Sequence, residues 1–391
     1  MHPAPRNVGN DETVTFDRDI LAPRSASSDG DFDVAPPVSR RTVTLTISLL
    51  VTAVLAAVLL VLPTPYAVRT PGPTENTLGS QELGDGESMR EVPLVEVPDD
   101  LANDATGELL LTTVSVFGGP GGDVLVGDVL WGWAAKDRSV QPVELMFPVG
   151  ITQEQQQEEA QAEMLSSQET ATVAALTELG YEVPATLTIA GTSEGTGAAG
   201  VAEAGDVVRS LGGEPIETYS ELLAALGTVT PGDDVVLGVE RDGKPVDLTI
   251  TTSEGDGRAL LGVLIDAQYD YPIDVQIQIE NIGGPSAGMM FALAIIHKLT
   301  PEDELDGQVV AGTGTIDVDG RVGEIGGIEQ KMAGAVRDGA EWFLAPRGNC
   351  DQVVGNIPEG LDVVAVSTLS DARQAVEAIG AGEAQGLPTC S

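Results

Sequence analysis

The 391-residue sequence has few of the side chains on which many enzymes depend. It contains two histidines, two cysteines and four lysines, which are Lys136, Lys244, Lys298 and Lys331. Two distant cysteines and a single histidine beyond the N-terminal tail cannot close a zinc site, so we expect no metal and no cofactor. The 19 basic residues are far outnumbered by 61 acidic ones. Because phosphate contacts need a basic face, we expect no nucleic acid partner.

One motif makes the scarcity of histidine important, and it runs from Gly283 to Gly288 as Gly-Gly-Pro-Ser-Ala-Gly. The two leading glycines allow a tight turn, and an apolar helix is predicted from Ser286 to about Lys298. Ser286 would then lie at a helix start, where unpaired backbone N–H groups could stabilise an oxyanion. The alternative is that Ser286 merely caps this helix, with Pro285 helping to start it.

The same motif fits the nucleophile elbow of α/β-hydrolases, which requires a histidine further along the sequence. Only His2 and His297 are present. Eleven helical residues would place His297 roughly 16 Å along the helix from Ser286, too far to accept its proton. The sequence therefore excludes a histidine-based triad, and another base is needed.

Lys331 is the candidate base. Gly326 and Gly327 precede it, and the helix that follows carries Ile328, Met332, Ala335 and Val336 on one stripe, with Lys331 at the stripe's edge. Partial burial and the positive end of the helix would both lower its pKa, so that a neutral amine could take the serine proton. The alternative is a lysine whose stem covers the stripe while its head stays in water.

These motifs resemble the proteolytic domain of Lon-type (S16 family) proteases over residues 270 to 385. The family's P-S-A-G motif matches Pro285 to Gly288, and its G-G-[IL]-x-x-K motif matches Gly326 to Lys331. The resemblance implies that Thr313, in the T-G-x-I match, hydrogen-bonds the catalytic lysine. One departure is Gly283, because Lon proteases commonly have aspartate three residues before the serine.

Most Lon proteases attach this domain to an ATPase module, whose phosphate loop needs Gly-x-x-x-x-Gly-Lys followed by Ser or Thr. None of the four lysines is followed by either residue. The sequence therefore predicts a protease that is ATP-independent, and another element must supply substrate.

Residues 185 to 253 resemble a bacterial PDZ domain. Its G-D-V-[IV] signature appears at Gly205 to Val208, and its P-G-D…R-D-G-K signature at Pro231 to Lys244. PDZ domains bind extended peptides or protein C-termini by adding a strand to a sheet edge, so protein or peptide substrates are the expected partners. The resemblance places the carboxylate-binding loop before the first strand, near Ala185 to Leu187. A β-rich spacer without a ligand is the alternative.

An uncharged run from Val43 to Leu62 is long enough to cross a bilayer as a helix and lacks a signal-peptide cleavage site. Arg40 and Arg41 flank its start, whereas only Arg69 lies close after its end. By the positive-inside rule, the N-terminus is expected in the cytoplasm and the remainder outside it, at the cell membrane. A bridge between Cys350 and Cys390 is plausible in that compartment.

The expected organisation has five parts and a mixed α/β (α+β) fold class. They are a disordered cytoplasmic tail (1–41), a single transmembrane helix (42–64), an exterior β segment with a connecting helix (65–184), the PDZ domain (185–253) and the Lon-type proteolytic domain (258–385). Thr152 to Gln155 form a capping box that opens the connecting helix, with Met164, Leu165, Leu176 and Leu179 on its inner side. The resemblance gives the last part the fold of ribosomal protein S5 domain 2.

The whole arrangement resembles the YlbL-like family of membrane-anchored PDZ-S16 peptidases over residues 40 to 385. It implies a serine endopeptidase in which Ser286 attacks the scissile carbonyl, Lys331 is the general base and acid, and Thr313 orients the lysine. Two rivals stay open: a non-catalytic PDZ scaffold or chaperone at the membrane surface, and a glycine-rich phosphate site at Gly283 to Gly288, as in kinases of similar fold. The sequence does not identify the substrate, its cleavage site or an oligomer.

Overall fold

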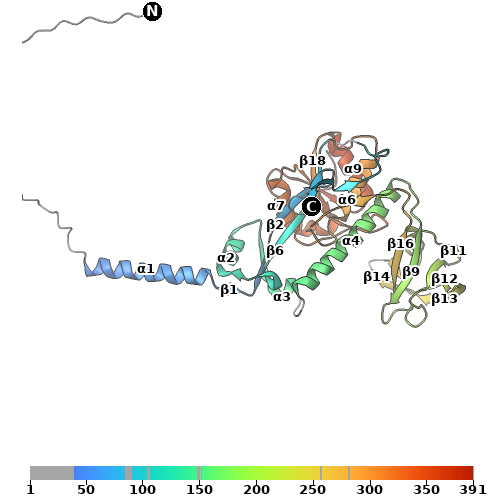
Figure 1. The fold of residues 1–391 in the computed structure, drawn as a ribbon, viewed down its shortest axis with the longest axis horizontal. Coiled ribbons are helices and arrows are strands. Elements are labelled where there is room, and N and C mark those ends of the chain that lie inside the picture. Colours follow the sequence, from blue (N-terminus) through green and yellow to red (C-terminus); the bar gives the residue numbers. More distant parts are fainter. Residues whose placement is uncertain are drawn as a thin grey trace, which may run out of the picture. The chain divides into compact units, whose positions relative to one another are not determined.

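The computed structural model describes residues 39–83, 90–103, 106–147, 150, 152–255, 258–280 and 282–390. The first 38 residues of the expected tail lie outside these ranges. The chain divides after Ala57 into two units, and helix α1 (Arg40–Leu60) supplies most of what is described of the first (Figure 1). Among the described residues, α1 is the one helix long and apolar enough to span a membrane. It begins at Arg40, two residues before the expected start of the span, and ends at Leu60, four residues before its expected end.

A six-stranded sheet forms the centre of the second unit, in the order β22-β21-β18-β6-β2-β8. Its four strands from β22 to β6 are parallel, and β2 and β8 add antiparallel pairs. The strands are β2 (Tyr66–Asn76), β6 (Glu108–Phe117), β8 (Ser139–Pro142), β18 (Val309–Gly312), β21 (Trp342–Pro346) and β22 (Asp362–Val366). Buried parallel strands read as continuous apolar runs, which explains the sequence of β6.

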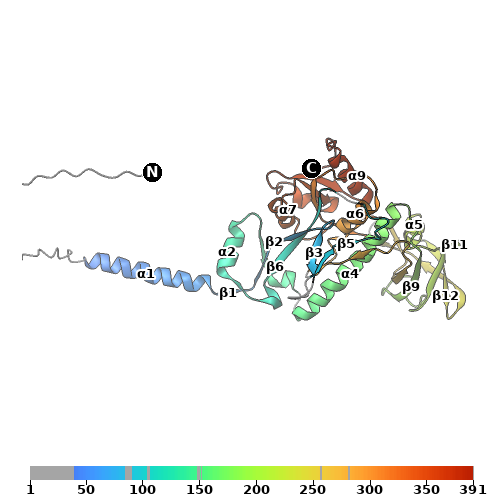
Figure 2. The same ribbon diagram turned by 45° about the horizontal axis from the view of Figure 1, so that its top comes forward.

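Helices cover both faces of this sheet (Figure 2). Successive residues of β6 point to opposite faces, so Leu109 and Leu111 join one core while Leu110 joins the other. The first core contains α6 (Gly288–Leu299), α9 (Leu369–Gly380) and part of α4 (Gln153–Glu178). The second contains α7 (Ile328–Arg337) and α8 (Cys350–Val353). The sheet thus holds α6 and α7, which carry the two predicted catalytic motifs, on opposite sides of one layer.

The segment expected as a separate exterior β region is part of this same sheet. β2, β6 and β8 all come from residues 65–184, and the first four residues of β6 pair with β18, so that Leu109 lies opposite Val310. The predicted boundary therefore does not separate two folding units. Strands that pair across some 200 positions leave no local signal in the sequence, so the sequence alone did not predict that residues 65–184 share a sheet with the proteolytic domain.

Helix α4 begins as predicted, because Thr152 and Gln155 form the reciprocal capping box. Met164 and Leu176 are buried and Leu179 is partly buried, as expected. Leu165 was wrongly placed inside, since 62% of it is exposed.

A second sheet, in the order β13-β12-β10-β9-β16, forms the PDZ domain with helix α5 (Tyr219–Gly227). Its strands are β9 (Ala185–Thr192), β10 (Val207–Leu211), β12 (Asp234–Arg241), β13 (Lys244–Thr251) and β16 (Val263–Tyr269), with β11 (Glu214–Pro215) beside β10. β16 was expected in the proteolytic domain, but it pairs with β9 from Val263 to Tyr269. The PDZ sheet therefore extends to residue 269.

Five short pairs of strands lie outside these two sheets in the described ranges. They are the pairs β1 (Pro63–Thr64) with β7 (Val124–Leu125), β3 (Ser80–Leu83) with β4 (Arg90–Pro93), β5 (Val95–Glu96) with β17 (Gln276–Ile277), β14 (Ser253–Gly255) with β15 (Arg258–Leu260), and β19 (Thr315–Ile316) with β20 (Val322–Gly323). Helices α2 (Val126–Ala134) and α3 (Val143–Met146) lie beside β8 and β2.

The PDZ helix packs directly against the hairpin formed by β19 and β20. Val318, at the tip of this hairpin, is buried in a cluster that includes Tyr219 and Leu223 of α5. Ser220 Oγ donates a hydrogen bond to the Val318 carbonyl oxygen at 3.3 Å, and Arg258 lies 3.5 Å from Asp319 in an ion pair. The two domains therefore share a small apolar core.

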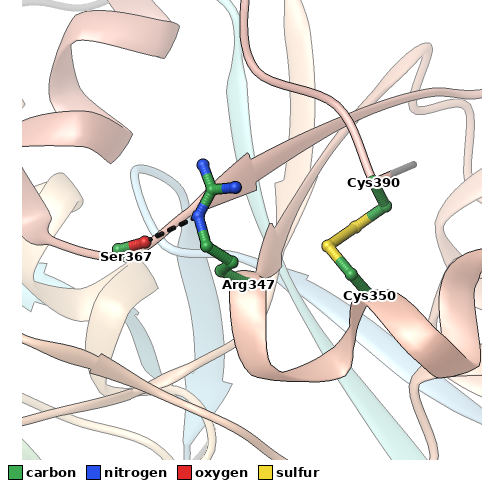
Figure 3. The surroundings of a disulfide bond; sticks show 4 residues. All are labelled: Arg347, Cys350, Ser367 and Cys390. Atoms are coloured by element: carbon green, nitrogen blue, oxygen red, sulfur yellow. Dashed lines mark hydrogen bonds between the residues drawn. A yellow bond between two sulfur atoms is a disulfide. The ribbon is translucent and has the colours of Figure 1, made fainter.

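Cys350 and Cys390 form a disulfide that ties the C-terminal segment to the start of α8 (Figure 3). The bridge closes a loop across a sequence separation of 40 residues. The expected pairing of the two cysteines is therefore present.

Removing this bridge should destabilise the protein without touching the active site. We expect Cys350→Ser/Cys390→Ser to lower the free energy of unfolding by roughly 2–4 kcal/mol, because the unfolded polypeptide regains loop entropy. Chemical denaturation with and without dithiothreitol checks this. Only the wild type should respond to the reductant, and an equal response by the variant would contradict the prediction.

Candidate active site

Ser286 lies in the turn that leads into α6. The helix begins at Gly288, two residues later than expected, and its N-cap residue is Ala287, which makes no capping hydrogen bond through its side chain. The Ser286 carbonyl oxygen accepts hydrogen bonds from Thr313 Oγ1 at 3.0 Å and from the Gly314 N–H at 2.9 Å. The capping alternative for Ser286 is therefore wrong, and its hydroxyl is left for another partner.

Lys331 is the fourth residue of α7 and only 2% of it is exposed. Gly327 adopts a left-handed conformation (φ 74°) at the N-cap of this helix, which only glycine takes readily. The helix then buries Ile328, Met332 and Ala335 against the sheet together with Lys331. The alternative interpretation, in which the head of this lysine stays in water, is therefore wrong.

The three predicted residues meet at the end of this lysine. Lys331 Nζ lies 2.7 Å from Ser286 Oγ and 2.8 Å from Thr313 Oγ1. The Thr313 hydroxyl donates its one hydrogen to the Ser286 carbonyl, so it can only accept from Lys331. As an ammonium, Lys331 donates to Ser286 as well. As a neutral amine, it has a lone pair with which to accept the Ser286 hydrogen.

Burial lowers the pKa of Lys331 to about 7, because desolvation penalises the ammonium. A substantial fraction of neutral amine would then exist near neutral pH. This arrangement is a nucleophilic hydroxyl beside a base whose pKa matches its task.

Helix α4, which no motif linked to the site, holds the turn before Ser286. The Ala160 carbonyl oxygen accepts a hydrogen bond from the Gly284 N–H at 2.8 Å. Seven residues further along the helix, the buried Ser167 donates from Oγ to the Pro285 carbonyl oxygen at 3.0 Å. In a planar trans peptide, the Pro285 C=O and the Ser286 N–H point in opposite directions. Ser167 therefore orients the N–H of the candidate nucleophile.

The same helix explains why residue 283 departs from the Lon pattern. A Cβ at Gly283 would lie 2.7 Å from the Ala160 Cβ and 3.3 Å from Ala160 backbone atoms. Such contacts are shorter than packing tolerates, so an aspartate here would displace α4. The position of the usual acid is occupied by a helix.

A cleft of about 440 Å³ opens beside Ser286 and Lys331. Thr113, Val114 and Ser115 of β6 line it, together with Met164 of α4. It combines apolar walls with a few convergent polar groups, which is typical of ligand sites.

His297 has no part in this cluster, as expected. It is buried on α6, with Nε2 3.5 Å from Asp303 and Nδ1 3.9 Å from Glu304. Within the described ranges, no group of three or more histidine, cysteine or acidic residues could hold a metal ion.

Sequence reasoning found Ser286, Thr313 and Lys331 but missed Ala160 and Ser167. Both lie in a Gln/Glu-rich helix with no motif, and Ala160 acts through its backbone carbonyl. The single hint was Gly283, where a missing side chain indicated that something else lies close.

Comparison with protein families agrees with this geometry. Residues 274–377 match the model of the Lon protease (S16) C-terminal proteolytic domain, and residues 187–252 match that of the PDZ domain. The protein therefore combines a PDZ domain with a Lon-type proteolytic domain in a mixed α/β structure. These matches support a serine peptidase.

Curated relatives match over limited segments. Lon protease 2 of Herpetosiphon aurantiacus is 35% identical over 114 residues, which are 27% of this chain and 14% of the relative. Lon protease of Rhizobium meliloti is 31% identical over 40% of this chain and 20% of its own length. Periplasmic pH-dependent serine endoprotease DegQ of Escherichia coli is 42% identical over 15% of this chain and 12% of its own length. The protein thus spans a fifth or less of each.

The α4 contacts predict that Ser167→Ala will lower kcat while leaving KM nearly unchanged. The Pro285 carbonyl oxygen keeps a longer hydrogen bond from the Gly288 N–H at 3.4 Å. The variant therefore loses one hydrogen bond, about 0.5–1.5 kcal/mol, which corresponds to roughly a 2- to 10-fold lower kcat if the orientation of the Ser286 N–H is lost. Steady-state cleavage of a peptide checks this, with the exposed neighbour Ser166→Ala as the control. A variant that melts earlier but keeps its kcat would show that Ser167 is structural only.

The lowered pKa of Lys331 also predicts how stability depends on pH. Between about 7 and the ordinary value of 10.5, the unfolded polypeptide binds the proton more strongly, so stability should rise with pH in this window. Below pH 7 both states are protonated and the full penalty applies. Lys331→Met should therefore be more stable than wild type at pH 6, by several kcal/mol at about 1.4 kcal/mol per pKa unit. Urea denaturation at pH 6, 8 and 10 measures this, and a difference independent of pH would contradict it.

Proposed function

We propose that this protein is an ATP-independent, membrane-anchored serine endopeptidase with a Ser286–Lys331 dyad, acting outside the cytoplasm on protein or peptide substrates. The observation that carries the proposal is the buried Lys331 Nζ at 2.7 Å from Ser286 Oγ, with a pKa lowered to about 7. The anchor would be α1, whose length and composition suit one span.

In the proposed reaction, neutral Lys331 accepts the hydroxyl proton as Ser286 Oγ attacks the scissile carbonyl carbon. Thr313 accepts an N–H from the lysine and so directs the amine's lone pair at Ser286. Backbone N–H groups around Ser286 stabilise the oxyanion, with Ser167 and Gly314 holding the two flanking carbonyls. The ammonium then gives its proton to the leaving amine, and water hydrolyses the acyl-enzyme with Lys331 as base again.

Substrate delivery is assigned to the PDZ domain, with a carboxylate-binding loop at a different place from the one expected. The carboxylate-binding loop was expected near Ala185 to Leu187, but these residues lie in β9 and pair with residues 267–269 of β16, so they form no such loop. The sheet ends at β16, and the loop that enters it contains Leu261 and Gly262. We assign peptide addition to the free edge of β16 and the carboxylate-binding loop to these two residues.

The dyad predicts that Ser286→Ala and Lys331→Ala each abolish cleavage. Lys331→Arg should be inactive too, because a guanidinium stays protonated. In the wild type, kcat/KM should rise with pH and reach half its maximum near pH 7, where Lys331 loses its proton. The rate at which a fluorophosphonate phosphonylates Ser286, with loss of fluoride, should show the same dependence on pH. Turnover by Lys331→Ala, or a limb near pH 10, would reject Lys331 as the base, and no labelling would favour the scaffold.

The β16 assignment predicts that Ala267→Pro weakens cleavage of proteins carrying a recognised C-terminus, chiefly through KM. Ile189 makes its backbone bonds to the β10 side, so the β9 register turns the N–H of Ala267 outward, and proline removes it without breaking the ladder. Ala267→Ser is the matched control, and a short peptide that bypasses the PDZ domain should be cleaved equally by all three. Unchanged KM for the protein substrate would place delivery elsewhere.

A further inference from the structure

Several exposed apolar side chains lie on α2, on α3 and at the end of β6, three elements that all contact β2. Leu130, Trp131 and Trp133 of α2 are 48%, 61% and 64% exposed. Phe117 at the end of β6 and Leu145 in α3 are also exposed. We call these five residues the tryptophan face, and it holds two of the protein's three tryptophans. A cluster of large apolar groups in water normally marks an interaction surface.

The tryptophan face is held rigidly. Val129 of α2 packs with Val68 and Val124 in a small core, and the buried Gly132 brings the helix close to β8, where an added Cβ would lie 2.6 Å from Val140. The Trp133 ring meets Tyr66 edge-on at 6.2 Å between ring centroids. The exposed side chains are therefore presented outward by a packed helix.

The elements that carry this face pair with the first residues after α1. The Val126 N–H donates to the Leu62 carbonyl oxygen at 2.9 Å, which fixes the start of α2. Phe117 lies opposite Val68, and Pro142, which precedes α3, lies opposite Tyr66. Figure 1 shows α2 and α3 beside β1 at this end of the second unit.

The short connection limits how far α2 can lie from the anchor. Helix α1 ends at Leu60, and the two residues to Leu62 span at most about 7 Å. The start of α2 is therefore within roughly 10 Å of the end of α1, whatever direction α1 takes. If α1 spans a bilayer, the interface at its C-terminal end is therefore close to the start of α2 along the chain.

We propose that the tryptophan face inserts into the interface of the bilayer that α1 spans, at the boundary between headgroups and acyl tails. The inference rests on the anchoring proposed above. Tryptophan is enriched at this depth because its ring is apolar and its N–H is polar. Lys136, exposed just after α2, has a stem long enough to reach lipid phosphates. A protein partner could bind such a surface. We favour lipid because the short connection from Leu60 to Leu62 keeps α2 close to the proposed membrane anchor.

The test uses the full-length protein in phosphatidylcholine vesicles whose acyl tails are brominated near the headgroup, because bromine quenches tryptophan fluorescence on contact. The comparison is Trp131→Phe/Trp133→Phe, which keeps only Trp342 of β21 as an internal control. We expect brominated lipid to quench the wild type at least twofold more, as a fraction of its signal, than the double variant. Trp131→Phe alone, which leaves the Tyr66 contact intact, should lose about half of the excess.

Flotation of each protein with the vesicles distinguishes failure of the α1 anchor from failure of the tryptophan face to insert. If both proteins float but show equal fractional quenching, the tryptophan face does not insert into the bilayer, and the proposal that α1 is an anchor is unaffected. Protein that stays at the bottom of the gradient overturns the anchor, and the docking surface with it.

Discussion

A lysine amine enclosed by protein is the constraint on which the rest of this site depends. Removing an ammonium from water is costly. The lowered pKa and the short contact to Ser286 both follow from that enclosure. Two layers of packing maintain it, since α7 is buried against one face of the central sheet and α6 against the other.

The proteolytic unit is built from segments on both sides of the PDZ domain in the sequence. Strands β2, β6 and β8 and helix α4 precede β9, whereas β17, α6 and β18 follow β16. The PDZ domain is thus an insertion, tied at both ends to elements that line the catalytic cleft. α4 holds the nucleophile turn at one end, and the segment leaving β16 leads to that turn at the other.

The hairpin formed by β19 and β20 contacts both the turn at Ser286 and the helix of the PDZ domain. Thr313 and Gly314, at the foot of β19, bind the Ser286 carbonyl, whereas Val318 and Asp319 at the tip contact α5 and Arg258. Packing on the PDZ helix and the geometry of the nucleophile therefore share a short stretch of backbone. Apart from the ion pair between Arg258 and Asp319, these contacts are apolar packing and neutral hydrogen bonds.

Local sequence patterns were enough to predict the chemistry that we propose and most of the local elements. With so few lysines and histidines, the motifs around Ser286 and Lys331 left one base, and glycines marked turns that only they could form, as at Gly327. Three features became visible only in the tertiary structure. They are the strands that complete each sheet, the burial of Lys331, and the position of α4 in the space that an aspartate side chain at residue 283 would need. Those outcomes depend on pairing and close approach between residues far apart in the sequence, from 45 positions for Ser286 and Lys331 to about 200 for β6 and β18. Local periodicity carries no record of such contacts, because each partner's own pattern is satisfied equally well by other neighbours.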